Sequence, residues 1–171
     1  MKLAKVFYIL IIVLYSFSVN GQGDVLYEPF EFNMSEAEVH ELFKKNRKRF
    51  KTITLGSGTS YSLRKGSLNF EAEKLYSITL WSKKNLDLRN AEAYLKNTRK
   101  YLELIGFTMV YAQEYWDKPL QRDNNKPCIR FMNKEKKILL DLESRGQGSV
   151  YNVFLSFYSL TWFTDRVKLV R

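Results

Sequence analysis

The sequence predicts an α+β protein in which an antiparallel sheet carries two helices packed on one face. Two segments space their apolar residues by three and four positions, which is the period of an amphipathic helix. Most of the remaining chain consists of short segments of alternating apolar and polar residues, bounded by glycine or charged residues, as in antiparallel strands. Aromatic residues make up 15% of the chain, which favours a sheet with a large buried face.

The N-terminal residues 1–21 predict a signal peptide. Two lysines precede an apolar run at 6–15, which is shorter than the ~20 residues that span a bilayer. Val19 and Gly21 suit a cleavage site for signal peptidase. The alternative is an uncleaved membrane anchor. We therefore expect a secreted or periplasmic protein with no transmembrane span after cleavage.

The first helix is expected at residues 36–48. Ser35 and Glu38 form the S-x-x-E pattern of a capping box, and Met34 and Val39 have the spacing of a hydrophobic staple. These signals fix the start of the helix and turn its apolar side toward the sheet.

The second helix is expected at residues 88–105. Asp87 can cap its first turn, and Gly106 follows the last apolar position, where glycine commonly ends a helix. Phe107 then has the position of the residue that contacts Leu102 in a Schellman closure.

Strands are expected between and after these helices. A short strand is predicted near 30–32, and the tail at 161–170 is predicted to be a strand or a short helix. In the strand at 74–82, alternation places Leu75 on the face of Trp81, and Tyr76 on the other face with Leu80. The remaining strands are expected at 51–55, 59–66, 67–73, 107–116, 128–133, 136–144 and 149–159.

The chain contains two similar strands, "LYSITLWS" at 75–82 and "VYNVFLSF" at 150–157. Each follows a helix and several strands, so residues 22–171 form either one domain built from repeat units 30–83 and 86–160, or one domain without repeats. If the units are equivalent, Tyr76 and Tyr151 should occupy matching positions.

The phrase "FEFNMSEAEVHELF" resembles the start of the helix in SmpA/OmlA outer-membrane lipoproteins and in beta-lactamase-inhibitor-protein-like repeats. Met34, Ser35 and Val39 match the phrase of these families, whereas Asn33 stands where they usually have glycine. The lipoprotein cysteine is also missing. The resemblance covers less than a tenth of the chain and implies architecture only: helices packed on an antiparallel sheet in an envelope protein.

The chain is basic, with a formal net charge of +10. For a secreted protein, this charge favours an envelope protein or an anionic envelope polymer as partner, and no nucleic acid. The simpler interpretation is a lysine-rich surface that keeps the protein soluble. The densest charge lies at residues 44–51, where the cations also suit the end of a helix. The predicted basic patch contains Lys44, Lys45, Arg47, Lys48 and Arg49.

The sequence offers little for catalysis. His40 is the only histidine and Cys128 the only cysteine, so we expect no Ser-His or Cys-His centre, no metal site and no cofactor. We expect Cys128 to be a buried apolar residue rather than a reactive thiol. Asp141 and Glu143 share one face of a strand, and such a pair leaves an envelope hydrolase as the alternative function.

Aromatic residues are more numerous than one small core requires, and exposed aromatic patches often mark partner surfaces. The favoured function is therefore a secreted or periplasmic, non-enzymatic binding or scaffold protein of the cell envelope, using an open sheet face. The candidate binding residues are Tyr115, Trp116, Tyr158, Trp162 and Phe163.

Overall fold

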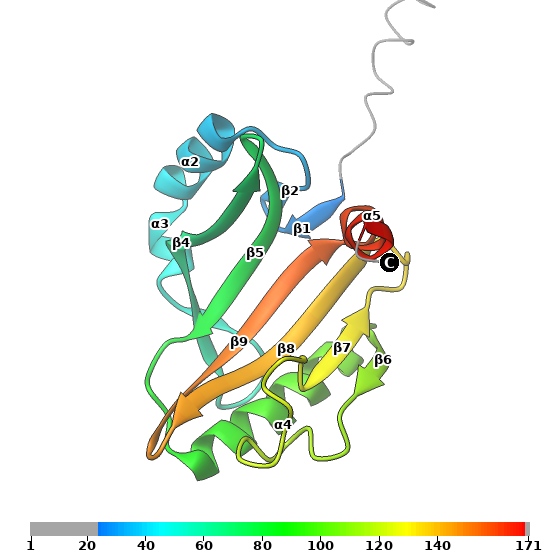
Figure 1. Ribbon diagram of the computed structural model, residues 1–171. Coiled ribbons are helices and arrows are strands. Elements are labelled where there is room, and N and C mark those ends of the chain that lie inside the picture. Colours follow the sequence, from blue (N-terminus) through cyan, green and yellow to red (C-terminus); the bar gives the residue numbers. More distant parts are fainter. Residues whose placement is uncertain (1–23, 170–171) are drawn as a thin grey trace, which may run out of the picture.

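A computed structural model describes residues 24–169 of the chain and has the predicted α+β fold. In chain order, the elements are β1 (Val25–Tyr27), β2 (Phe30–Glu31), α2 (Glu36–Lys45), α3 (Arg47–Phe50), β3 (Ile53–Thr54), β4 (Ser60–Glu71), β5 (Lys74–Ser82), α4 (Leu88–Leu104), β6 (Thr108–Ala112), β7 (Ile129–Met132), β8 (Ile138–Gln147), β9 (Val150–Ser159) and α5 (Leu160–Leu169). Seven of the described strands form one antiparallel sheet in the order β3-β4-β5-β9-β8-β7-β6, and β1 and β2 form a small second sheet (Figure 1).

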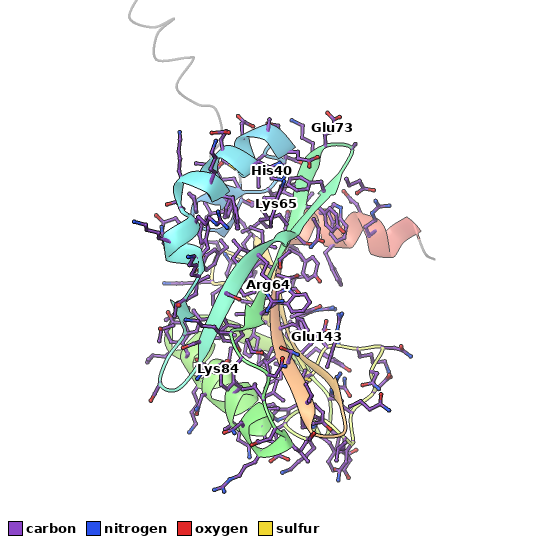
Figure 2. All side chains as sticks on the ribbon, turned by 90° about the vertical axis from the view of Figure 1, so that its left-hand side faces the viewer. His40, Arg64, Lys65, Glu73, Lys84 and Glu143 are labelled. Carbon is purple, nitrogen blue, oxygen red and sulfur yellow. The ribbon has the colours of Figure 1, made fainter. Side chains whose placement is uncertain are left out.

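The helices lie on both sides of the large sheet. As predicted, α2 and α4 cover the same face, whereas α5 projects from the opposite face (Figure 2). One apolar core fills the space under α2 and α4 and extends through both halves of the sheet, including Val39 of α2 and Leu95 of α4. The side opposite α2 and α4 is called the open face below. It carries alternate residues of β4, β5, β9, β8 and β7, among them Ser62, Trp81, Phe154, Asp141 and Arg130.

The predicted helix caps are present. The Ser35 hydroxyl accepts from the Glu38 backbone N–H, and the Glu38 carboxylate accepts from the Ser35 backbone N–H at 3.0 Å. Asp87 accepts from the Asn90 backbone N–H at 2.7 Å at the start of α4. At its end, the Phe107 N–H donates to the Leu102 carbonyl at 2.9 Å, which is the Schellman hydrogen bond.

The first helix is shorter than the predicted 36–48. It stops at Lys45, and α3 follows after Asn46. The Asn46 side chain donates to the Leu42 carbonyl at 2.9 Å and its backbone N–H donates to the same oxygen at 3.0 Å. An asparagine that bonds the preceding turn in this way competes with the continuing helix, which explains the break.

Two β-bulges change what strand alternation predicts. The segments at 59–66 and 67–73 were expected as separate strands but form the single strand β4. Leu63 pairs with Leu80 and Leu68 with Ile78, so the four residues 64–67 lie opposite Thr79 alone. The extra residues leave the ladder without ending the strand.

The second bulge lies at Tyr76. Asn69 pairs with Ser77 and Phe70 with Leu75, which leaves Tyr76 as the extra residue. The predicted faces of Leu75 and Tyr76 are therefore wrong, because the bulge turns Leu75 into the core and Tyr76 onto the open face.

The two similar strands are neighbours at the centre of the sheet. β5 and β9 pair antiparallel with Leu80 opposite Leu155. A half-turn about that pair exchanges the two leucines, so this part of the match fits a local twofold axis. Tyr76 and Tyr151 do not match, because Tyr151 is buried on the core face.

Several other elements differ in length or type from the prediction. The tail forms helix α5, and β3 and β6 are shorter than the expected strands at 51–55 and 107–116. The predicted signal peptide lies outside the described residues. None of the helices within 24–169 is long and apolar enough to cross a membrane.

Candidate functional site

The centre of the open face is formed by β5 and β9. Trp81 and Phe154 are paired residues on these strands, and their rings meet edge to face with centroids 4.6 Å apart. Beside them, the hydroxyls of Thr79 and Ser156 are 2.9 Å apart and hydrogen-bonded. An apolar sheet surface with no helix over it is costly to expose to water.

Arginine side chains cover the two central rings. The guanidinium carbon of Arg64 lies 4.7 Å from the Trp81 ring centroid, and that of Arg145 lies 5.2 Å from the Phe154 centroid. Arg145 also donates to Glu143 at 2.9 Å. A guanidinium lying on a ring gains a cation–π attraction and shields the ring from water.

A second aromatic group lies where α5 leaves the open face. Trp162 stacks on Tyr76 at 4.4 Å and on Tyr158 at 5.9 Å between centroids. Its indole N–H donates to Glu71 at 3.0 Å, and Arg166 forms an ion pair with the same carboxylate. These contacts attach α5 to the end of the sheet.

Arg130 connects this group to the middle of the face. It lies 4.4 Å from the Phe163 ring centroid and donates two hydrogen bonds to Asp141, at 2.7 and 2.8 Å. Burial raises the pKa of Asp141, and the hydrogen bonds from Arg130 oppose that rise. Burial, followed by the nearby Asp141 carboxylate, also raises the pKa of Tyr158 to about 12.

The predicted carboxylate pair lies on β8. Asp141 and Glu143 share the open face as predicted, and their pairing partners are Ser156 and Phe154. Each carboxylate is hydrogen-bonded to its own arginine, Arg130 or Arg145. A general acid or nucleophile needs an oxygen that can reach a substrate. Arg130 donates to both oxygens of Asp141, and Arg145 donates twice to one oxygen of Glu143.

The predicted aromatic residues separate into two locations. Tyr158, Trp162 and Phe163 come together on the open face. Tyr115 and Trp116 lie instead in the loop after β6. There Trp116 packs against the core, and the guanidinium carbon of Arg99 of α4 lies 4.9 Å from the Trp116 ring centroid.

Sequence reasoning missed the residues that form the middle of the open face. Trp81 and Phe154 were present in the two similar strands, and their even spacing from Thr79 and Ser156 was the available signal. Without knowledge that β5 and β9 are neighbours, nothing in the sequence connects them. The arginines that cover them come from two further strands and leave no local pattern.

The predicted basic patch lies elsewhere, along the α2–α3 junction. Lys44 and Arg47 line a groove of about 620 Å³ between these helices and the bulge of β4. Arg64 belongs to both regions: it covers Trp81 on the open face and also lines the groove. In Figure 2, His40, Lys65 and Arg64 follow one another along the edge that faces the viewer.

The histidine and the cysteine take no part in the open face. His40 lies 3.7 Å from Glu36 and makes an edge contact with Phe70 at 5.7 Å. Cys128 is fully buried just before β7. Within residues 24–169, no three His, Cys, Asp or Glu side chains gather as a metal site would require.

Burial raises the pKa of the Cys128 thiol, so little thiolate forms at mildly alkaline pH. We therefore expect iodoacetamide to label native Cys128 at least about a hundredfold more slowly than the unfolded chain, because the thiol must first be exposed by unfolding. Mass spectrometry with and without denaturant measures both rates. Equal rates would show an accessible thiol.

No family model matches the chain, and no curated protein or solved structure matches it either. The resemblance of the Met34–Val39 phrase to envelope domains is thus an expectation from the sequence alone.

Proposed function

We propose that the protein is a secreted, non-enzymatic binding protein of the cell envelope, and that its open face contacts an acidic protein partner. The observation that carries the proposal is the set of four arginine–ring contacts on that one face. The pairs are Arg64 with Trp81, Arg145 with Phe154, Arg130 with Phe163, and Arg166 with Trp162.

Tryptophan, tyrosine and arginine are the side chains that most often dominate protein–protein binding energy. A guanidinium stacked on a ring keeps its N–H groups at the edge, and those that no carboxylate of the same chain occupies can bind a carboxylate of a partner. Arg64 is exposed and has no acidic partner among the described residues, and the Arg145 side chain is 67% exposed. Together with the excess of basic over acidic residues in the chain, this favours a partner that presents carboxylates.

The N-terminal residues support the proposed location in the cell envelope. The positive start and short apolar run of residues 1–21 support export. The helix-opening phrase at Met34–Val39, which resembles that of envelope domains, supports the same compartment. A hydrolase has weaker support, because both candidate carboxylates are held by arginines.

Binding is tested by capture from an envelope extract with the mature protein as bait. We expect one acidic protein to be recovered and Trp81→Ala to lower its affinity at least about thirtyfold, which corresponds to a hot-spot loss of about 2 kcal/mol. Isothermal calorimetry with the purified partner measures the change.

Trp116→Ala is the matched control, since it also removes a half-buried tryptophan beneath an arginine, but beside α4. Both variants must first show cooperative thermal unfolding. An equal loss of affinity in the two variants, or recovery of no specific protein, would contradict the proposal.

A further inference from the structure

The basic groove lies on the side of the molecule where α2 and α3 meet the bulge of β4. Its walls carry the cations Lys44, Arg47, Lys51, Arg64 and Lys65. A second hollow of about 770 Å³ shares Lys44, Arg47 and Lys51, so the cationic surface continues along the helix junction.

Two irregularities of the fold concentrate these charges. The break at Asn46 places α3 directly after α2, and Lys51 is the C-cap residue of α3. The four-residue bulge in β4 moves Arg64 and Lys65 out of the strand ladder toward the helices. Both irregularities add charge to the same groove, although like charges gathered in one place repel each other.

The groove cations lack the compensation found elsewhere on the molecule. Across residues 24–169, no carboxylate forms an ion pair with any of these five cations, and Glu41 is the one acid on the groove wall. Between α4 and the loop after β6, by contrast, Lys96 forms an ion pair with Asp117 at 3.1 Å, and Lys118 forms one with Glu92 at 2.9 Å.

The helix dipole explains only part of the charge. Lys44 lies in the last turn of α2, where a cation stabilises the helix end. Arg64 and Lys65 belong to a strand, so their position is not explained by a preference for the last turn of a helix.

We propose that this groove binds a linear polyanion, an envelope polymer with closely repeated phosphate groups. Lys44, Arg47 and Lys51 are three and four residues apart along the α2–α3 junction, and all three line the same groove. Charges within the Debye length of about 8 Å at physiological salt are not screened from one another, so cations gathered in one groove act together. A chain with regularly spaced anionic groups neutralises them all, whereas a single anion does not.

The groove suits the backbone of such a chain as well as its charges. Its floor includes Leu63, which is buried, and Phe43, which is half-buried and stacked on Phe50 at 5.5 Å. The partly exposed ring of Phe43 can contact the carbon skeleton between phosphates. This site is separate from the partner surface of the open face, and Arg64 is the residue common to both.

The test uses long-chain inorganic polyphosphate as the probe and the mature wild-type protein. We expect the triple variant Lys44→Gln/Arg47→Gln/Lys51→Gln to weaken binding at least about tenfold in low salt. Because each neutralised phosphate adds about −0.7 to the slope of log affinity against log salt for a single chain, the variant's slope should be shallower by about two.

The matched control Lys100→Gln/Lys134→Gln/Lys136→Gln removes the same charge from exposed positions outside the groove. We expect it to bind polyphosphate within about twofold of wild type. Equal weakening in the two triple variants would overturn the proposal, because net charge alone would then explain binding.

Three further probes separate the ligand classes. Orthophosphate at equal phosphate concentration should compete poorly, and phosphatidylglycerol vesicles and duplex DNA should bind more weakly than polyphosphate at equal charge. Competition by orthophosphate as effective as that of the polymer, or tighter binding to vesicles or duplex DNA, would contradict a site for a single-chain phosphate polymer of the envelope.

Discussion

Replacing Asp141 with alanine is expected to reduce the free energy of unfolding by about 3–5 kcal/mol. Asp141 is 5% exposed and accepts two hydrogen bonds from Arg130. Its removal leaves the half-buried guanidinium without a counter-charge, and the lost attraction is not replaced by water. Urea unfolding monitored by circular dichroism measures the change.

Two comparisons identify the cause of this loss. Glu143→Ala removes the other carboxylate of β8, whose partner Arg145 is 67% exposed, and should cost under about 1 kcal/mol. The double variant Arg130→Met with Asp141→Leu replaces both charges with apolar side chains and should recover most of the stability. A double variant no more stable than Asp141→Ala would contradict the account of an uncompensated charge.

The same variants distinguish a structural pair from a catalytic one. If Asp141 and Glu143 stabilise the open face, the two single variants differ strongly in stability. If they served as an acid and a nucleophile, both variants would lose activity while the folded state changed little. The bidentate contact of Arg130 favours the first outcome.

Replacing Gly146 with alanine is expected to destabilise the protein by about 3 kcal/mol or more, because overpacking against backbone cannot be relieved by a side-chain rotation. An added Cβ would lie 2.2 Å from the Val150 carbonyl oxygen and 2.6 Å from the Tyr151 Cα. Gly146 pairs with Tyr151 next to the hairpin turn between β8 and β9, so the clash separates the two strands at that end. Thermal unfolding measures the effect.

Gly66→Ala is the control for this substitution. A Cβ at Gly66 meets no atom within 4 Å, and the residue lies in the bulge of β4. We expect a change of under about 1 kcal/mol in either direction. A similar loss at both glycines would show that backbone entropy, rather than the close contact at Gly146, sets the cost.

The sequence predicts the parts of the fold that depend on neighbouring residues. Ser35 and Glu38 cap α2, and Gly106 ends α4, because these interactions span only a few positions. The α+β class and the placement of two helices on one face follow from the spacing of apolar residues.

The remaining features depend on contacts between distant segments. The bulge at Tyr76 exchanges the two faces predicted for the start of β5, and alternation cannot show such an extra residue. The sequence also does not show which strands are neighbours. Trp116 is therefore among the residues predicted to bind, and Trp81 is not. Only the pairing of β5 with β9 brings Trp81 to Phe154, and only the fold lays Arg64 over that ring.

We propose that the open face contacts a protein partner. The most direct measurement places a photo-crosslinking amino acid at Ser62, which pairs with Trp81 on this face, and at Ala93, an exposed position on α4. Irradiation in an envelope extract is followed by mass spectrometry of the products. We predict one crosslinked acidic protein from Ser62 and none from Ala93. The same protein crosslinked from Ala93 but not from Ser62 would contradict the account.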